Sequence, residues 1–147
     1  MGSLFTLRDA RESDIPMINA YTYAEGMDNI PSLDNVRVAA NADDVAVGFI
    51  RIQHCADGRA YINPMATYSA WRGYGVGRAL IQDAIEREGA LWFVSRGGSI
   101  GFYERMGCVA CDWEEIHPDI ASDCDGCPMR DECGPLPMHS FLPESQK

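Results

Sequence analysis

The sequence has no apolar run that approaches the roughly 20 residues a membrane-spanning helix needs. Its N-terminus lacks the basic segment followed by an apolar one that is typical of a signal peptide. Basic residues are also scarce, since 12 lysines and arginines stand against 22 acidic residues, a formal net charge of −10. This balance argues against a nucleic-acid surface. We therefore expect a cytoplasmic protein with no membrane and no nucleic-acid partner.

The rest of the composition is that of a soluble globular protein. The chain has 147 residues and a mass of 16.2 kDa, 46% of its residues are hydrophobic, and 14 are glycine. This length suffices for one hydrophobic core, so we expect residues 1–147 to form a single domain. The acidic charge favours a cationic amine as substrate, although solubility explains it equally well.

Apolar periodicity and turn residues predict alternating strands and helices. Ser13 is the expected N-cap of the first helix, and Asp57-Gly58 is typical of a tight turn between strands. The expected strands are residues 3–8, 36–40, 45–54, 60–67, 90–95, 108–115 and 138–142, and the expected helices are 13–24, 76–88 and 99–106. Residues 27–35 are expected to be a loop or a short helical piece, and residues 117–137 to be irregular. This order predicts an α/β fold with a mixed sheet that contains one right-handed βαβ unit.

A glycine-rich turn, Arg72-Gly73-Tyr74-Gly75-Val76-Gly77, directly precedes the predicted helix 76–88. Glycines let backbone N–H groups approach a ligand closely, and the start of a helix adds unpaired donors and a positive dipole end. Such a turn is suited to phosphate. A Walker A loop is excluded because the turn has no lysine, and the dinucleotide fingerprint is missed because the third glycine arrives one residue early.

The spacing Arg72-x-x-Gly75-x-Gly77 resembles the pyrophosphate loop of the GNAT superfamily of N-acetyltransferases. Residues 101–107, Gly-Phe-Tyr-Glu-Arg-Met-Gly, are similar to a second segment of that family, F/L-Y-E-x-x-G-F. Two features depart from the family: Ser95 to Ser99 lacks the usual Asn, and Cys108 replaces the usual Phe. The resemblance covers nearly the whole chain and implies a mixed, mostly antiparallel sheet flanked by helices. The Cys-rich segment 117–137 is expected to be a loop between the last two strands.

The resemblance further implies acetyl transfer from acetyl-CoA to a primary amine by direct attack in a ternary complex. The backbone near Met65 to Thr67 would pair with the pantetheine arm and stabilise the oxyanion, and the glycine-rich turn would hold the diphosphate. The implied cofactor-binding residues are Met65, Ala66, Thr67, Arg72, Gly73, Tyr74, Gly75, Val76, Gly77 and Arg78.

Acetyl transfer also needs an acid for the departing thiolate and a route for the amine proton. The resemblance implies that Tyr103 is the acid, and its alternative is a core aromatic residue with a satisfied hydroxyl. The base is open: Glu25, His54 and Glu114 are candidates, and an ordered water would need none of them. A module that binds acyl-CoA without catalysis is the alternative function.

Six cysteines form the second unusual feature. Cys124, Cys127 and Cys133 have the spacing of metal ligands, and zinc needs fewer assumptions than an iron–sulfur cluster. The fourth ligand would come from Cys111, His117 or His139. The alternatives are unliganded thiols or a disulfide formed after purification. Cys108 is interpreted as a small core residue. A metal- or thiol-binding protein is therefore a third hypothesis, and the sequence leaves a homodimer open.

Overall fold

The computed structural model describes residues 4–125, 127 and 130–141. Within them, seven strands form one sheet in the order β1-β2-β3-β4-β5-β7-β6. The strands are β1 (Thr6–Asp9), β2 (Val36–Ala40), β3 (Ala46–His54), β4 (Ala60–Thr67), β5 (Ala90–Ser95), β6 (Val109–Ala110) and β7 (Leu136–Phe141). The helices are α1 (Ile15–Ala24), α2 (Val76–Glu88), α3 (Ile100–Arg105), α4 (Pro118–Asp125) and α5 (Arg130–Cys133). The predicted mixed sheet is confirmed: β4 and β5 pair in parallel, whereas β1-β2, β2-β3, β5-β7 and β6-β7 are antiparallel.

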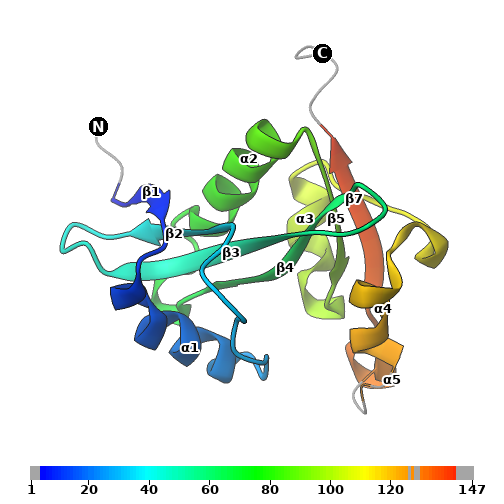
Figure 1. Ribbon diagram of the computed structural model, residues 1–147, viewed down its shortest axis with the longest axis horizontal. Helices are drawn as coiled ribbons and strands as arrows, with labels where there is room; N and C mark the ends of the chain where they lie inside the picture. Colours follow the sequence, from blue (N-terminus) through cyan, green and yellow to red (C-terminus); the bar gives the residue numbers. More distant parts are fainter. Residues whose placement is uncertain (1–3, 126, 128–129, 142–147) are drawn as a thin grey trace. The chain divides into compact units, whose positions relative to one another are not determined.

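The chain divides into two compact units, and the first comprises residues up to Ile52 together with Pro64–Asp83. Within it, α1 packs on one face of β2 and β3, the face that carries Val36, Val38 and Phe49 (Figure 1). The buried residues of this layer are Ile18, Tyr21, Val36, Val38, Ala46, Phe49 and Ala66. Val38 lies opposite Phe49 in the β2-β3 register, so these two side chains point to the same face. Ala39 and Ile50, which alternate with them, are buried as well, so the hairpin is covered on both faces.

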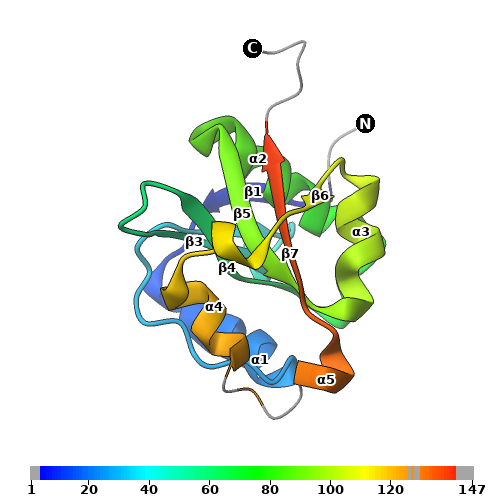
Figure 2. The ribbon, with the colours of Figure 1, turned by 90° about the vertical axis from the view of Figure 1, so that its right-hand side faces the viewer.

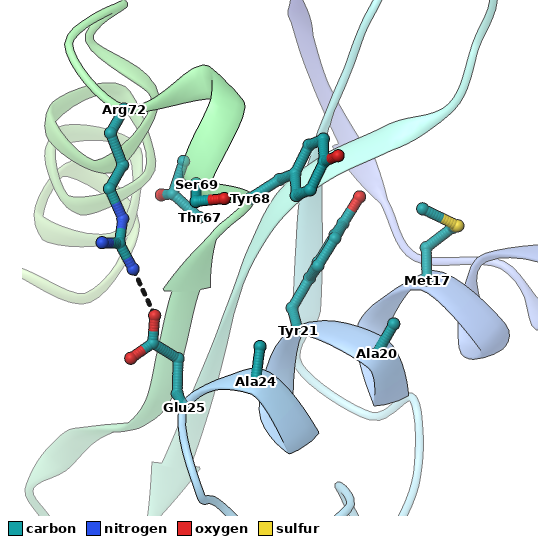
Figure 3. Close-up of a pocket in the computed structure, with 9 residues that line it drawn as sticks. All are labelled: Met17, Ala20, Tyr21, Ala24, Glu25, Thr67, Tyr68, Ser69 and Arg72. Atoms are coloured by element: carbon teal, nitrogen blue, oxygen red, sulfur yellow. Dashed lines mark hydrogen bonds and ion pairs between the residues drawn. The ribbon is translucent and has the colours of Figure 1, made fainter.

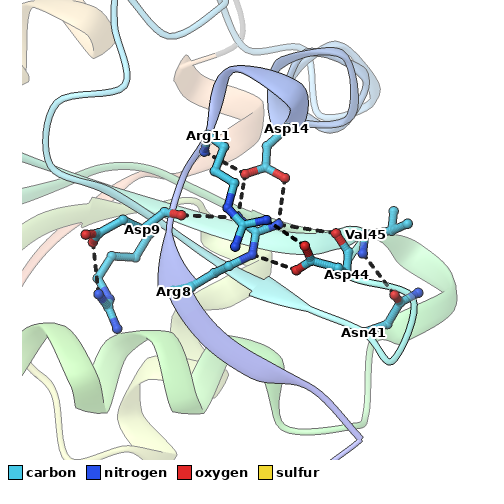
Figure 4. A network of polar contacts seen from close by, with 8 residues as sticks. Arg8, Asp9, Arg11, Asp14, Asn41, Asp44 and Val45 are labelled. Atoms are coloured by element: carbon cyan, nitrogen blue, oxygen red, sulfur yellow. Dashed lines mark hydrogen bonds and ion pairs between the residues drawn. The ribbon is translucent and has the colours of Figure 1, made fainter.

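A polar network ties β1 to the start of α1 and to the β2-β3 turn (Figure 4). Arg8 donates to both carboxylate oxygens of Asp14, at 2.7 and 2.9 Å, and to Asp44 at 2.9 Å. Asp14 also accepts the backbone N–H of Arg11 at 2.7 Å. Burial alone would raise the pKa of Asp14, but these bonds outweigh it and hold that pKa below its ordinary value.

The second unit comprises Gln53–Asn63 and the chain from Ala84 onward. Here β7 lies between β5 and β6 (Figure 2), and β5 alternates between fully and partly buried residues. Phe93 contacts Tyr103 of α3 on one face, with 4.4 Å between ring centroids. Trp92 packs on the other face against a cluster that includes Ile120 of α4. The strand β5 is therefore covered on both faces.

Four sequence predictions are corrected by the structure. The strand expected at 108–115 is only β6, because Asp112 and Glu115 form a capping box around a 3-10 turn at Trp113–Glu115. The segment 117–137, expected to be irregular, contains α4 and α5 and leads into β7, which begins at Leu136. The first strand begins at Thr6 rather than at residue 3, which lies outside the described residues. Ser13 lies inside a 3-10 turn and does not cap α1. Among the described residues, no helix has the length and apolar character needed to span a bilayer.

Candidate active site

The glycine-rich turn has the backbone geometry that its sequence predicts. Gly73 and Gly75 have φ angles of 89° and 83°, in the left-handed region that residues with a Cβ rarely adopt. The turn then passes directly into α2, which begins at Val76. A helix leaves its first N–H groups without intrahelical partners, so the amides from Gly75 to Arg78 are available to an anion at this end of α2. Gly77 belongs to the helix itself.

Close packing against β3 holds the start of α2 in place. Gly48 of β3 faces Val76, and a Cβ at Gly48 would lie 2.7 Å from the Cγ1 atom of Val76 and 3.3 Å from the carbonyl oxygen of Ala66. Only a glycine permits this approach of β3, β4 and α2. Val76 is itself fully buried, so the start of the helix is anchored while the preceding turn stays exposed.

A cavity of about 320 Å³ lies beside the turn, between α1 and the end of β4 (Figure 3). It is lined by Met17, Ala20, Tyr21, Ala24, Glu25, Thr67, Tyr68, Ser69 and Arg72. The structure thus brings together three residues that the sequence predicted separately: Glu25, Thr67 and Arg72. Glu25 and Arg72 form an ion pair at the rim.

Two tyrosines that the sequence analysis missed form one wall of this cavity. The hydroxyl of Tyr21 donates to the carbonyl oxygen of Ala46 at 2.6 Å, and its ring stacks on that of Tyr68 at 5.6 Å. The N–H of Tyr68 donates to the carbonyl oxygen of Val47 at 2.8 Å and fixes the chain just after β4. Tyr21 and Tyr68 are far apart in the sequence, and nothing local in the chain indicates that their rings stack.

Tyr103 belongs to the second unit and is buried in α3. Its ring packs against Phe93 at 4.4 Å and against Phe102 at 5.1 Å. Burial, followed by the neighbouring Cys108 thiol, raises the pKa of Tyr103 to about 12. The phenol therefore keeps its proton at neutral pH.

The other candidate bases lie in different surroundings. His54 forms a hydrogen bond with Glu88, with 2.7 Å between the Nε2 atom of His54 and the Oε1 atom of Glu88. Glu114 is exposed in the 3-10 turn before α4. Neither lines the cavity beside the turn. Of the three predicted bases, Glu25 is the one that lies there.

The predicted metal set of Cys124, Cys127 and Cys133 lies only partly within the described residues. Cys127 is exposed and Cys133 is half-buried, whereas the side chain of Cys124 lies outside the described part of the chain. Within the described residues, the group of metal-ligating side chains that lie close together is Cys55, His117 and Asp119. Cys111 and His139 do not belong to it. Cys108 is buried, as predicted for a residue that replaces a core Phe.

Comparison with known proteins adds a family and a set of similar folds. Residues 34–107 match the model of the acetyltransferase (GNAT) domain, and no curated protein matches the chain. A Mycobacterium tuberculosis protein in complex with CoA and NLQ is 17% identical, with a TM-score of 0.75 over 94% of this chain and 99% of its own. N-acetylglutamate synthase from Neisseria gonorrhoeae, complexed with CoA and N-acetyl-glutamate, is 15% identical, with a TM-score of 0.78 over 98% of this chain and 36% of its own. Nourseothricin acetyltransferase is 21% identical, with a TM-score of 0.68 over 96% of this chain and all of its own.

Proposed function

Because the chain belongs to the GNAT acetyltransferase family, we propose that it transfers an acetyl group from acetyl-CoA to a primary amine, by direct attack in a ternary complex. The observation that carries this proposal is the glycine-rich turn: Gly73 and Gly75 adopt left-handed φ angles immediately before α2, with Arg72 at the rim. Two proteins of similar fold were solved with CoA, which supports the choice of cofactor.

The residues at this turn fit the diphosphate of CoA. Backbone N–H groups at the start of α2 and the planar guanidinium of Arg72 are the donors that phosphate oxygens bind best. Arg78, in the first turn of α2, is proposed as a second cation. The backbone of Met65 to Thr67, at the end of β4, is proposed to pair with the pantetheine arm as an added strand would.

The cavity beside the turn is proposed as the acceptor site. Its volume of about 320 Å³ suits a small organic amine, and its lining combines apolar side chains of α1 with one carboxylate. Glu25 is placed to attract a cationic amine and to accept its proton. Arg72 cannot keep its bond to Glu25 and bind a diphosphate with the same N–H groups, so cofactor binding is expected to release Glu25 for this role.

Tyr103 is proposed as the acid that protonates the CoA thiolate. Bound acetyl-CoA supplies the acetyl thioester, and the reaction leaves a thiolate that must be neutralised. Burial raises the pKa of Tyr103 to about 12, so the phenol is protonated at neutral pH and can donate a hydrogen bond to the thiolate.

The test is release of the CoA thiol in the presence of a panel of small amines, measured against a reaction without amine. Tyr103→Phe is expected to lower kcat by about 10²- to 10⁴-fold, with unchanged acetyl-CoA binding, because the ring and its packing remain. Tyr23→Phe is the matched control, since Tyr23 is 85% exposed. Binding of acetyl-CoA without turnover on any amine would favour the non-catalytic alternative.

A further inference from the structure

We propose that Cys55, His117 and Asp119 form a zinc site in the second unit. The three residues come from the β3-β4 turn, the residue before α4 and the first turn of α4. One potential ligand atom from each lies within 4.8 Å of the other two. Ligands on one tetrahedral zinc ion are about 3.5 Å apart, so small side-chain rotations bring the three atoms to a common metal. This site is independent of the proposed acetyl transfer.

The backbone on both sides of the site is held firmly. Tyr61 is fully buried, and its hydroxyl accepts the N–H of His117 at 2.9 Å and donates to the Asp57 carboxylate at 2.7 Å. Arg59, in the same turn as Cys55, donates to the carbonyl oxygen of Glu115. The β3-β4 turn and the start of α4 are thus fixed to each other by bonds that do not use the three ligand groups. Such a supporting shell is what a metal site requires.

The hydrogen bonds of His117 fix which ring nitrogen would bind. The backbone N–H of Asp119 donates to Nδ1 of His117 at 3.1 Å, so Nδ1 carries a lone pair and the ring proton is on Nε2. The Asp119 carboxylate lies 3.6 Å from the same Nδ1. A metal at Nδ1 would replace the backbone N–H of Asp119 as the partner of this nitrogen. That N–H belongs to the first turn of α4 and can donate a hydrogen bond to water instead. Nδ1 and the Asp119 carboxylate then chelate one ion.

The ligand chemistry selects zinc. Thiolate, imidazole and carboxylate together suit Zn²⁺ better than Ca²⁺ or Mg²⁺, which prefer oxygen ligands alone. One thiolate and one carboxylate also balance the two positive charges of the ion. Cys55 packs against the apolar cluster of Tyr61, Ile116 and Ile120, whereas Asp119 is exposed. The metal would therefore sit at the protein surface with three protein ligands and a water molecule.

Cobalt titration of the reduced, chelator-treated protein tests this site. Co²⁺ replaces Zn²⁺ in tetrahedral sites, and a thiolate ligand gives a charge-transfer band in the near ultraviolet. We expect one cobalt per chain with this band, reversed by added zinc. Cys55→Ser is expected to abolish the band, and His117→Gln and Asp119→Asn to weaken cobalt binding at least tenfold. The matched control replaces Cys124, Cys127 and Cys133 by Ser and is expected to keep the band unchanged.

Two results would overturn the proposal. One is absence of a thiolate band in the wild-type protein at millimolar cobalt. The other is a band that persists in Cys55→Ser and disappears in the triple serine variant, which would assign the metal to the Cys-rich segment instead. Circular dichroism of Cys55→Ser checks its fold, and His117→Gln, whose side chain is not part of the core, provides an independent variant if Cys55→Ser fails to fold.

Discussion

Arg72 pairs with Glu25 in the structure, and the proposed function requires the same guanidinium to bind the diphosphate of CoA. The Arg72 side chain is 61% exposed, so the ion pair adds little to stability. A weak pair is easily exchanged for a doubly charged ligand. The Arg72–Glu25 ion pair couples the proposed cofactor site to the proposed acceptor site, because Glu25 cannot bind an amine while its carboxylate is paired with Arg72.

The substitution Glu25→Gln distinguishes the role of Glu25 as partner of Arg72 from its proposed role as proton acceptor for the amine. Loss of the competing carboxylate frees Arg72, so the affinity for acetyl-CoA is expected to rise by up to about fivefold. Acetyl transfer is expected to fall by about 10²-fold or more, because the amine loses its proton acceptor. The measurements are calorimetric titration of acetyl-CoA and steady-state turnover, with Glu86→Gln on the exposed face of α2 as control. Unchanged turnover would exclude Glu25 as the base.

At the scale of elements, local patterns predicted most of the fold. The β2-β3 hairpin, β4, α2 and β5 were predicted because alternation, turn residues and a helical stripe are encoded within each segment. Helices α4 and α5 were missed because they are short, with 8 and 4 residues, and lie in a segment rich in Asp, Pro, Cys and Gly. Ile120 of α4 is buried against Tyr61, so tertiary packing supplies the stability that local propensity does not.

Substitution of Gly97 tests the packing of the Cys-rich segment against the turn that precedes α3. A Cβ at Gly97 would overlap the carbonyl oxygen of Cys133, the last residue of α5. Gly97→Ala is therefore expected to destabilise the protein by about 1–3 kcal/mol, a fall of several degrees in Tm. A Cβ added at the neighbouring Gly98 would meet no atom within 4 Å, and the φ of Gly98 is not positive, so Gly98→Ala should be neutral or slightly stabilising. Equal Tm values for the two variants would contradict this packing.

At the scale of the whole molecule, the sequence predicted the site only where its residues are contiguous. The glycine-rich turn was recognised because residues 72–77 are consecutive. The cavity was not, because α1 and the end of β4 meet only through the fold. Likewise, Cys55 and His117 are far apart in sequence, and the sequence assigned His117 to the Cys-rich segment. Spacing rules find ligands within one loop, whereas ligands brought together by topology leave no such pattern.

Acid sensitivity of the whole fold should reflect the Arg8–Asp14 network. Because the pKa of Asp14 is lowered in the folded state, the unfolded state binds more protons in acid. The resulting stability is present above about pH 4, the ordinary range of an Asp carboxyl, and is lost as the pH falls through the folded-state pKa. Asp14→Asn is expected to lower the free energy of unfolding at pH 7 by about 1–3 kcal/mol.

Urea unfolding of Asp14→Asn and wild type at pH 7 and in acid measures this effect. The difference between the two proteins should begin to shrink below about pH 4, where the unfolded state takes up the proton. It should be smallest below the lowered folded-state pKa of Asp14, where the native carboxylate is protonated as well. Asp43→Asn, at an exposed position of the β2-β3 turn, is the control and should follow the wild type. A difference that stays constant with pH would mean that Asp14 stabilises the fold through packing and not through its charge.

Calorimetric titration of acetyl-CoA into the wild type, Arg72→Ala and Arg87→Ala tests the central claim most directly. Arg87 is an exposed arginine in the last turn of the same helix, α2. We predict binding to the wild type and to Arg87→Ala with equal affinity. Arg72→Ala should bind about 10- to 100-fold more weakly, because charge-assisted bonds to the diphosphate are lost. No binding to the wild type at millimolar acetyl-CoA, or equal affinity in all three proteins, would contradict the assignment of this turn as the cofactor site.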